Sequence, residues 1–515
     1  MHRFKFLHPL LFAAFPILAF YTKNIHKVRF DRIILPLEFS IGFTLGLWLF
    51  LNGLIKDRYK TSLLVTYFLL LFYSYGQVYK VLDGFLVKNG EKDISLFVLW
   101  SAFLLIGSFL IIKFGRKLRG LEVFPLVTGG ILVLVSLIQI AGYNLNNNKV
   151  LFAYNDTTKT NKQLNNLNQN FPVITDRPDI YYIILDGYAS NEVLKNIYGY
   201  DNINFVNFLE SKDFNIAYNA HSNYALTHLS LASSLNMKYV SYLTDQIAAI
   251  NMIKDNEVLK ILKSKDYQAV HFNSGWVGTQ ENNFADLNVS CGVSNQFIAT
   301  FLKTTMLRTF NGMYLSDKAR DRVLCTFSQL ASIRENVDGP MFVFAHIVSP
   351  HPPYLFGPNG EQVKLTAENK VTGLDTWQDR KDYLNQLLFI NKMVMDLVRK
   401  LTFGRENSPI IIIQADHGSA STPGMEEYNP DLIQERMRPF IAYKLPDKEK
   451  FTYDNLTPVN IFRLIFNNYF NARYELLEDK YYFSNYSRPF EFIDVTESVN
   501  QFDMTSLRES LQTEE

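Results

Sequence analysis

The sequence is poor in the features that mark disulfide-rich, fibrous and low-complexity proteins. Only two cysteines occur in 515 residues, which excludes a disulfide scaffold. The 25 glycines and 18 prolines follow no collagen-like or low-complexity pattern, and no internal repeat is present. A chain of this length with 48% hydrophobic residues can bury a large core in more than one domain.

Charge is nearly absent from several stretches of the first 145 residues. A helix that crosses the hydrocarbon core of a bilayer needs about 20 apolar residues. Five apolar runs occur, at Phe6–Tyr21, Ile33–Ile55, Thr61–Leu82, Ile94–Phe114 and Val123–Tyr143. A cleaved signal peptide is the competing interpretation of the short first run, but its two prolines and the lack of a small-residue cleavage site favour a membrane helix. We therefore expect a five-helix transmembrane domain over residues 1–143.

The basic residues between these runs predict the orientation, because cytoplasmic loops carry an excess of Lys and Arg. The segment Lys113–Arg119 contains four basic residues, and Lys56–Lys60 contains three. Both segments are expected to be cytoplasmic, although the four basic residues of Lys23–Arg32 point the other way. We expect a multi-pass protein of the inner or plasma membrane, with everything after Tyr143 extracytoplasmic.

The part of the chain that follows is mildly acidic. Residues 1–145 carry 16 Lys and Arg against 7 Asp and Glu, a net charge of +9, whereas the remainder carries 35 against 43, a net charge of −8. Nucleic acid is not expected as a partner, because binding it needs a basic surface. We expect an Asn-rich linker over 144–171, a globular domain over 172–496 and an acidic tail over 497–515. Cys291 and Cys325 lie on the side of the membrane that is predicted to be oxidising. The sequence does not decide whether they form a disulfide with each other or remain two buried thiols.

Short apolar runs alternate with amphipathic stretches in the globular domain. Five runs read as buried strands, at Ile180–Leu185, Gln268–Phe272, Met341–Val348, Ile410–Gln414 and Pro439–Tyr443. Helical periods lie between them, at Asn202–Lys212, Glu257–Ser264 and Asp382–Leu401. This alternation predicts an α/β domain with a mostly parallel sheet sandwiched by helices. In such sheets ligands bind beyond the carboxyl ends of the strands.

Ionisable residues follow three of the expected strands. Asp186 follows the first, Asp416 and His417 follow the run of four isoleucines, and His351 lies just beyond Met341–Val348. A single Asp after a strand is usually a cap or a turn former. Asp-His-Gly at the end of a fully buried strand is different, because buried ionisable groups require a partner, and a cation such as Zn²⁺ or Mn²⁺ suits these ligands.

Asp186-Gly, Asp416-His417-Gly and His351, on this alternation of strands and helices, resemble the alkaline phosphatase/sulfatase superfamily. Five membrane helices followed by such a domain outside resemble its branch of lipoteichoic acid synthases and phosphoethanolamine transferases. The resemblance extends from Phe6 to Thr496 and includes Ser222–Asn236. It implies one divalent metal ion, Zn²⁺ or Mn²⁺, in an extracytoplasmic catalytic domain.

The resemblance also implies roles for individual residues. In that branch a metal-bound threonine nucleophile opens a helix in a Thr-x-x-Ser context, which here matches Thr227 and Ser230. His351 is expected to contact the phosphate of the substrate. A hydroxyl needs a base or a metal to become a strong nucleophile, and a helix N-terminus adds N–H donors for phosphoryl oxygens. A simple N-cap role is the alternative for Thr227, and Ser222 is the competing hydroxyl. The implied metal ligands are Asp186, Thr227, Asp416 and His417.

The sequence departs from its relatives at three points. The phosphoethanolamine and glycerol-phosphate transferases usually carry Glu where this chain has Asp186, so transfer and hydrolysis both stay open. The stretch that begins at Thr227 lacks the Cys-x-Pro-x-Arg pattern of formylglycine sulfatases, which argues against sulfate hydrolysis of that kind. No histidine follows His417, so a second metal site of the usual type is not expected.

The leading hypothesis is a membrane-bound transferase that moves a phospho-group from a lipid donor to an extracytoplasmic glycan or lipid acceptor through a phosphothreonine. A phosphodiesterase or sulfatase-like hydrolase with the same site is the second hypothesis, and a non-catalytic membrane scaffold is the third. The membrane domain favours transfer, because a hydrolase of soluble substrates does not need one. Of the other histidines, His271 is expected to lie in the core, and His221 is given no role. Four residues are candidates to line the site: His228, Trp276, His346 and Asn391.

Overall fold

The fold is described from a computed structural model of the chain. The residues that it describes are 7–23, 25, 30–83, 92–115, 117, 123–158, 177–291, 301–302, 304–363, 377–403, 408–447, 451 and 455–502. Two compact units divide the chain. The first contains residues 1–168 and 294–315, and the second contains residues 169–293 and 316–515.

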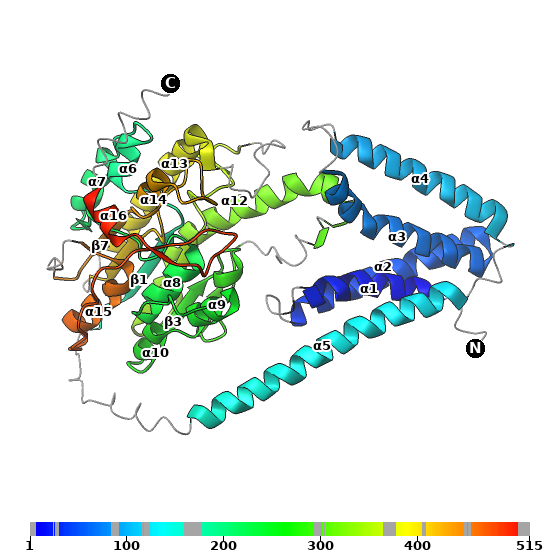
Figure 1. Cartoon of the computed structure of the whole chain (residues 1–515), viewed down its shortest axis with the longest axis horizontal. Coiled ribbons are helices and arrows are strands. Elements are labelled where there is room, and N and C mark those ends of the chain that lie inside the picture. The colour runs from blue at the N-terminus through cyan, green and yellow to red at the C-terminus, as the bar shows by residue number, and fades with distance from the viewer. Residues whose placement is uncertain are drawn as a thin grey trace. The chain divides into compact units, whose positions relative to one another are not determined.

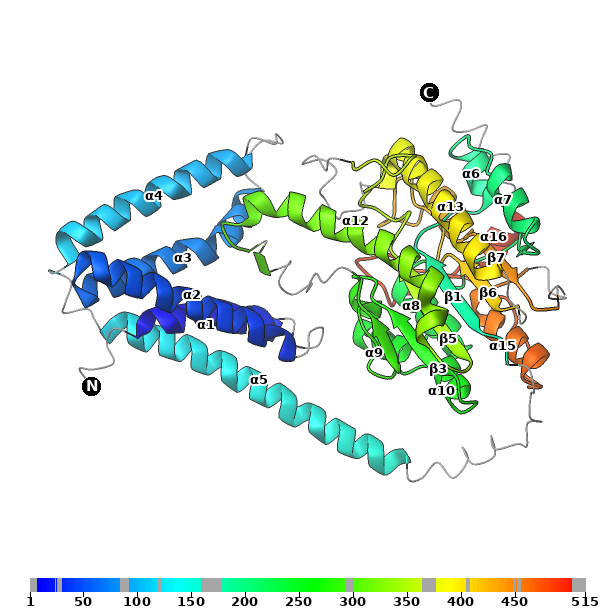
Figure 2. The ribbon, with the colours of Figure 1, turned by 180° about the vertical axis from the view of Figure 1, so that it is seen from behind.

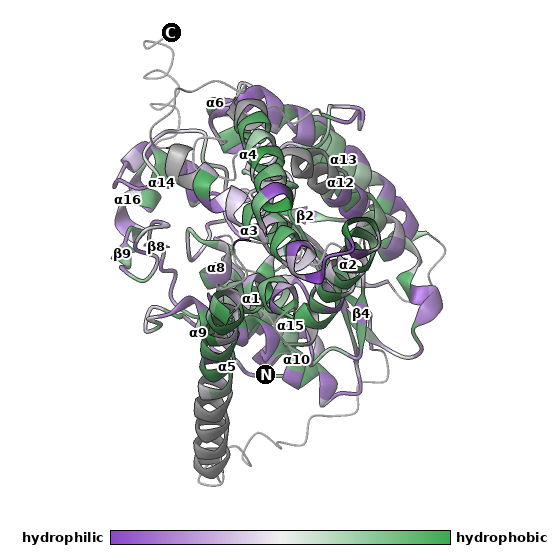
Figure 3. Cartoon of the chain, turned by 90° about the vertical axis from the view of Figure 1, so that its right-hand side faces the viewer, coloured by the Kyte–Doolittle hydropathy of each residue, from purple (hydrophilic) through white to green (hydrophobic). Residues whose placement is uncertain are grey.

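The first unit is helical (Figure 1). Its helices are α1 (His8–Lys23), α2 (Asp31–Ile55), α3 (Arg58–Asp83), α4 (Lys92–Phe114) and α5 (Val123–Thr158). Within the described residues, four segments are long and apolar enough to cross a membrane: Ile33–Ile55, Arg58–Tyr79, Leu96–Phe114 and Val123–Tyr143. Hydrophobic residues predominate along α4 and the coloured part of α5 (Figure 3). The protein is therefore a membrane protein, and four of the five expected spans are present.

The first expected run forms α1, which is only 16 residues long and contains Pro16. Its side chains are largely buried, among them Phe12, Ile17 and Tyr21. A bilayer span usually needs about 17 to 25 residues, so the fifth span stays a prediction. The helix α5 continues to Thr158, so the expected polar linker begins as helix, while its residues from 159 to 171 lie outside the described part of the chain.

The second unit is built on a seven-stranded sheet in the order β2-β7-β6-β1-β5-β3-β4. Only β7 runs antiparallel to its neighbours, so the expected mostly parallel sheet is confirmed. All five expected strands are present within one or two residues of their predicted bounds. The strands are β1 (Ile180–Leu185), β2 (Asn215–Ile216), β3 (Gln268–Phe272), β4 (Leu287–Val289), β5 (Met341–Ile347), β6 (Ile410–Gln414) and β7 (Ile441–Lys444).

Helices cover the sheet, and Figure 2 shows α12 and α13 in front of its strands. Tyr182 of β1 contacts two helices: its hydroxyl donates to Ser234 of α8, and its ring meets Phe462 of α15 edge to face. The three helical periods read from the sequence correspond to α7, α10 and α13. The helices are α6 (Asn191–Asn196), α7 (Ile203–Glu210), α8 (Thr227–Asn236), α9 (Gln246–Lys254), α10 (Glu257–Lys263), α12 (Arg308–Ser332), α13 (Arg380–Thr402), α14 (Pro430–Arg436), α15 (Pro458–Tyr469) and α16 (Thr496–Gln501). A small separate sheet pairs β8 (Tyr482–Phe483) with β9 (Ile493–Asp494).

The two cysteines form a disulfide, which answers the question left open by the sequence. The sulfur atoms of Cys291 and Cys325 are 2.10 Å apart. The bond closes a loop that includes residues 294–315, which belong to the helical unit. Within that unit the ring of Phe301 lies against Phe20 and Tyr73, with centroid distances of 5.7 and 5.6 Å. The acidic tail expected from residue 497 begins with α16, and its residues from 503 on lie outside the described part.

Candidate active site

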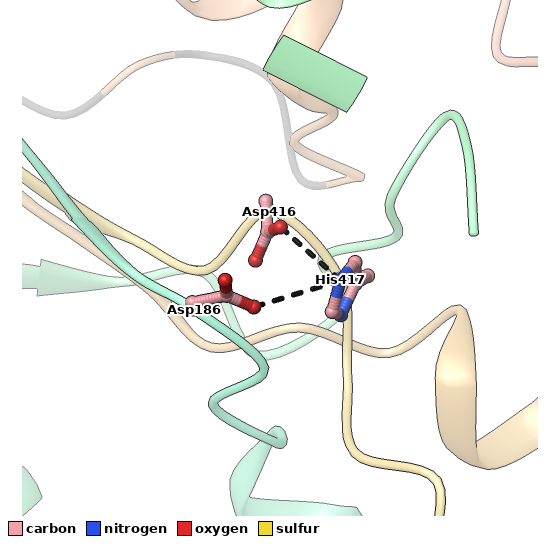
Figure 4. A group of neighbouring side chains, drawn as sticks. All are labelled: Asp186, Asp416 and His417. Atoms are coloured by element: carbon pink, nitrogen blue, oxygen red, sulfur yellow. Dashed lines mark ion pairs between the residues drawn. The ribbon is translucent and has the colours of Figure 1, made fainter. Parts of the chain in front are cut away.

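Two neighbouring strands bring the expected metal ligands together. The strands β1 and β6 run parallel and pair Ile184 with Gln414 at their carboxyl ends. Asp186 follows β1 directly, and Asp416 and His417 follow β6 after one residue. Because parallel strands end at the same edge, side chains that follow them converge there. Figure 4 shows the three side chains facing one another beyond this edge.

The three side chains form a compact buried group. One ligand atom from each of Asp186, Asp416 and His417 lies within 4.8 Å of the others. The Nε2 atom of His417 is 3.1 Å from Oδ2 of Asp416 and 3.7 Å from Oδ1 of Asp186. All three residues are at most 2% exposed. Two carboxylates and an imidazole at this spacing can hold a divalent metal ion.

The hydrogen bonds of His417 fix which nitrogen faces the carboxylates. Its Nδ1 lies 3.0 Å from the carbonyl oxygen of Gly418. A carbonyl only accepts, so Nδ1 carries the hydrogen and Nε2 presents its lone pair to the acidic group. Burial, with the positive charge of Arg436, holds the pKa of His417 well below its ordinary value, so the imidazole is neutral.

Within the described part of the chain, two buried carboxylate oxygens have no hydrogen-bond partner: Oδ1 of Asp186 and Oδ2 of Asp416. They are the same atoms that lie nearest to Nε2 of His417. Lone pairs that face one another in a buried site repel unless a cation or a proton lies between them. The donor set therefore fits a divalent metal.

The two carboxyl groups have opposite pKa shifts. Burial raises the pKa of Asp416 to about 7, and the negative charge of Asp186 adds to the shift. Burial acts on Asp186 in the same direction, but His351, His346 and His417 outweigh it and lower the pKa of this carboxyl below its usual range. The pair therefore shares about one proton near neutral pH when no cation binds it.

Thr227 places its hydroxyl at this group. It is the first residue of α8, and the N-cap position before it is taken by Leu226, without a side-chain cap. The Oγ1 atom of Thr227 lies 3.1 Å from Nε2 of His417. The hydroxyl thus contacts a candidate metal ligand and makes no side-chain cap of the helix, and its role as nucleophile stays a prediction.

The two neighbouring serines point elsewhere. The hydroxyl of Ser222 donates to the sulfur of Met437 at 3.8 Å. The hydroxyl of Ser230 donates to the backbone oxygen of Asp416 at 2.7 Å, and so supports the loop that carries this ligand. Of these three hydroxyls, only that of Thr227 contacts the side chain of a candidate ligand within the described part of the chain.

His351 lies beside the group without joining the three candidate ligands. Its backbone N–H donates to the backbone oxygen of Asp186 at 3.0 Å. Its ring meets Trp377 edge to face at 4.7 Å. Burial lowers the pKa of His351, against the opposing effect of Asp186. The structure therefore places His351 beside the candidate metal ligands, and its contact with a substrate phosphate stays a prediction.

Sequence reasoning missed Arg436, whose side chain is fully buried in the site. Its Nη2 lies 2.9 Å from Nε2 of His417 and donates to the hydroxyl of Tyr486 at 3.2 Å. Its guanidinium lies over the ring of Trp377 at 5.2 Å. Trp377 also packs against Gly187, where a Cβ would lie 2.4 Å from the indole. Arg436, Trp377 and Tyr486 thus form one side of the site.

Local sequence explains how Arg436 arrives there. The helix α14 starts at Pro430, and the side chain of Asn429 accepts from the N–H of Asp431 at 2.9 Å. The loop after β6 lies directly on the end of this helix, because Gly418 donates to the backbone oxygen of Arg436 at 2.7 Å. A Cβ at Gly418 would lie 2.2 Å from the backbone oxygen of Glu435. The glycine of Asp-His-Gly is therefore required for this close approach.

His346, a candidate lining residue, does contact the site. Its Nε2 is 3.2 Å from Oδ2 of Asp186, and its Nδ1 is 2.7 Å from the hydroxyl of Thr279. Trp276 meets the ring of His346 edge to face at 5.7 Å. His346 therefore orients the carboxylate of Asp186.

The other candidates lie away from the ligands. The ring of His228 packs on Phe490 at 5.9 Å. Asn391 accepts from the hydroxyl of Tyr188 and donates to Asn202, so it belongs to a buried polar network behind the site.

The two remaining histidines are structural. His271 is buried on Phe344, as expected for a core residue, and its Nε2 lies 2.9 Å from the backbone oxygen of Thr279. His221 stacks on Tyr481 at 4.9 Å.

An α/β domain that gathers two carboxylates, a histidine and a threonine hydroxyl at the carboxyl edge of its sheet has the architecture of a metal-dependent ester-cleaving enzyme. The Sulfatase family model matches residues 178–462, more than half of the chain and the whole of this group. The protein belongs to the sulfatase family and is an enzyme of the sulfatase-like type, as the sequence resemblance predicted. No curated protein matches the sequence.

Several solved structures are similar to the chain at low identity. The C-terminal periplasmic domain of EcEptC from Escherichia coli, in complex with Zn, is 10% identical over 64% of this chain and 98% of that chain, with a TM-score of 0.44. The soluble domain of lipooligosaccharide phosphoethanolamine transferase A from Neisseria meningitidis is 11% identical over 57% and 89%, with a TM-score of 0.38. The integral membrane form of that transferase is 14% identical over 85% and 88%, with a TM-score of 0.34.

Proposed function

We propose that the protein is a membrane-bound, metal-dependent transferase. It moves a phospho-group, such as phosphoethanolamine or glycerol phosphate, from a lipid donor to an extracytoplasmic glycan or lipid acceptor. The transferred group is held in between as a phosphodiester of Thr227. The observation that carries this proposal is the 3.1 Å contact between the hydroxyl of Thr227 and Nε2 of His417, within a buried acidic group.

The proposed metal ligands are Asp186, Thr227, Asp416 and His417, with one Zn²⁺ or Mn²⁺. When bound, such an ion lowers the pKa of a coordinated hydroxyl and neutralises carboxylate charge. Thr227 attacks the phosphorus of the donor, and the new bond from Oγ1 to phosphorus replaces the bond to the lipid alcohol. The hydroxyl of Thr227 loses one proton in this step and the leaving alcohol gains one, so the number of protons is balanced. In the second half, an acceptor hydroxyl attacks the phosphorus and loses its proton. The bond from phosphorus to Oγ1 breaks, and Thr227 regains its hydroxyl.

His351 is the proposed proton carrier. Burial lowers its pKa, so the neutral ring can take a proton from the acceptor hydroxyl in the second half of the reaction. In the first half the same ring takes up the proton that Thr227 loses and delivers it to the leaving alcohol. Its backbone bond to Asp186 keeps it beside the metal ligands.

Three features support an extracytoplasmic site at the inner or plasma membrane. The segments Lys56–Lys60 and Lys113–Arg119 are basic, as cytoplasmic loops are. The disulfide between Cys291 and Cys325 belongs to an oxidising compartment. The four membrane-spanning segments provide access to a lipid donor, which favours transfer over hydrolysis of a soluble substrate.

The test is intact-mass analysis of the full-length, metal-loaded protein after incubation with vesicles of phosphatidylethanolamine or phosphatidylglycerol. We expect an adduct with the mass of the phospho-headgroup, located at Thr227 by peptide mapping, and its loss when an acceptor is added. Release of the headgroup into water at the same rate without an acceptor would identify a hydrolase with this site. Donor turnover without any adduct at Thr227 would overturn the proposed intermediate.

A further inference from the structure

Arg436 carries a buried positive charge without an acidic partner. The residue is fully buried, and among the described residues no carboxylate oxygen lies within 4 Å of its guanidinium nitrogens. Arg438, two residues on, is also buried, and its Nε lies 3.5 Å from Oε2 of Glu192. Buried charges are normally paired, because the interior does not solvate them. The charge of Arg436 therefore requires an explanation that Arg438 does not.

Among the described residues, the hydrogen-bond partners of Arg436 are all neutral groups. Its Nε donates to the backbone oxygen of Ala225 at 2.9 Å, and its Nη1 to that of Gly418 at 3.2 Å. Its Nη2 donates to Nε2 of His417 and to the hydroxyl of Tyr486. A guanidinium has five N–H donors, so these four contacts leave one on Nη1 for a ligand. If Nε2 of His417 held a metal ion, its lone pair would no longer accept from Nη2, and one N–H of Nη2 would also be free to bind a ligand.

The carboxylate that is adjacent to Arg436 in the sequence is held by other groups. Glu435 precedes Arg436, but its carboxylate accepts from Tyr198, from Ser419 and from the N–H groups of Ser421 and Thr422. Glu435 thus anchors the loop after β6 through four bonds of its own.

The charges at the site can be counted with a divalent ion in place. The charge of the ion would equal that of Asp186 and Asp416 together, and an imidazole that donates from Nδ1 to Gly418 and offers its Nε2 lone pair to a metal adds no charge. The charge of Arg436 is then the remaining positive charge beside Thr227. A phosphodiester carries one negative charge, and so does the phosphodiester that Thr227 would carry in the proposed intermediate. A phosphate monoester carries close to two at neutral pH, which leaves the site with an excess of negative charge.

We propose that Arg436 is a catalytic residue that binds a non-bridging oxygen of the transferred group and makes the site selective for singly charged esters. The inference rests on the proposed function and specifies its substrate class: phosphodiesters in preference to phosphate monoesters. Tyr486, which lies beyond the part of the chain matched by the family model, is the positioning residue, since its hydroxyl accepts from Nη2.

The experiment compares three chromogenic probes on the full-length, metal-loaded protein. Bis(p-nitrophenyl) phosphate is a singly charged diester, p-nitrophenyl sulfate is a singly charged monoester, and p-nitrophenyl phosphate is doubly charged. We expect kcat/KM for the diester to exceed that for the doubly charged monoester at least tenfold. Arg436→Gln should lower kcat/KM for the diester by about 10²–10³-fold, the usual effect of removing one transition-state donor. The value of kcat/KM for the sulfate shows whether a single negative charge is enough for turnover or whether the ester must also contain phosphorus.

A binding measurement separates recognition from turnover. In the metal-loaded Thr227→Ala protein, which cannot form the adduct, bis(p-nitrophenyl) phosphate should bind at least tenfold more weakly once Arg436→Gln is added. Metal content should stay unchanged. The matched control is Arg438→Gln, which removes a second buried arginine with its own carboxylate partner and should leave the ratio between diester and monoester unchanged. Arg436→Lys keeps the charge but not the planar fork, so it should keep the preference for the diester at a lower rate.

Normal diester binding and turnover in Arg436→Gln would overturn the inference, and so would loss of the metal in this variant, because Arg436 would then support the ligands instead of the substrate. If Arg436→Gln does not fold, Arg436→Lys decides, since loss of the diester preference with the charge retained contradicts charge matching. An adduct at Thr227 that forms normally in Arg436→Gln would contradict the role of Arg436 and leave the proposed function standing. Absence of the adduct in the unmodified protein would contradict the proposed function itself.

Discussion

The hydroxyl of Thr227 lies 3.1 Å from Nε2 of His417, although 190 positions separate the two residues. One opens the helix α8, and the other follows the strand β6. A nucleophile and a metal ligand at this distance are what an activated hydroxyl requires. The predictions below ask whether this contact has the chemical consequence that its geometry supports.

Removal of one carboxylate ligand should release the metal. We expect Asp416→Ala to lose stoichiometric metal in elemental analysis while the protein stays folded, because the three remaining ligands include only one carboxylate to balance the charge of the ion. Asp396→Ala, which changes an exposed carboxylate on α13, is the control and should retain the metal. An Asp416→Ala protein with a full complement of metal would remove the three-residue group from consideration.

Metal binding should depend on pH in one direction. The pKa of Asp416 is raised to about 7 by burial and by Asp186, so the metal-free site holds a proton below this pH. The ion displaces that proton, and the apparent affinity should therefore rise by about fivefold from pH 6 to pH 7, reach about tenfold by pH 8 and level off above. His417 does not contribute, because its pKa lies well below its ordinary value. Calorimetric titration in buffers of different ionisation enthalpy measures the released protons, and equal affinity from pH 6 to pH 8 would contradict the shared proton.

Replacement of the nucleophile should abolish the covalent intermediate and spare binding. Thr227→Ala is expected to form no adduct by mass spectrometry, while donor lipid still binds. Ser222→Ala is the matched control, since its hydroxyl contacts Met437, and it should form the adduct normally. An adduct on Ser222 or Ser230 in the Thr227→Ala protein would show that the wrong hydroxyl was chosen.

Removal of the proposed proton carrier should slow turnover without loss of the ion. Proton transfer by such a group contributes about 10²–10⁴-fold in rate, and we expect His351→Ala to lower turnover of a phosphodiester donor by this factor. Metal content, measured on the same sample, should be normal because His351 is outside the three-residue group. Metal loss would instead make His351 a ligand.

The orientation can be tested on intact cells. Single cysteines introduced at exposed positions of the second unit, such as Tyr242, should react with an impermeant reagent from outside. Cysteines within Lys113–Arg119 should react only after permeabilisation, because positively charged loops stay in the cytoplasm. Labelling of this loop from outside would reverse the orientation and with it the extracytoplasmic role.

The sequence by itself determined the strands and the polar residues at their ends. Runs such as Ile410–Gln414 are continuous and apolar because both faces of the sheet are covered, and this pattern is local. Asp186 and the pair Asp416-His417 were identified for the same reason, since each follows a buried strand directly. The membrane spans were found from length and apolarity alone, and only the short first run is undecided.

Tertiary structure decided which groups from distant parts of the chain lie beside Asp186, Asp416 and His417. The order of the sheet places β1 between β5 and β6, which no local pattern encodes, and this order brings His346, Asp186 and His417 to one edge. The contacts of Thr227 with His417 and of Ser222 with Met437, and the pairing of the cysteines, also depend on separate segments that meet in the fold. Arg436 gave only a weak signal, a charged residue shortly before a buried strand. Its role depends on the burial of its charge beside His417 without a carboxylate, and burial is a property of the folded chain that the order of residues does not display.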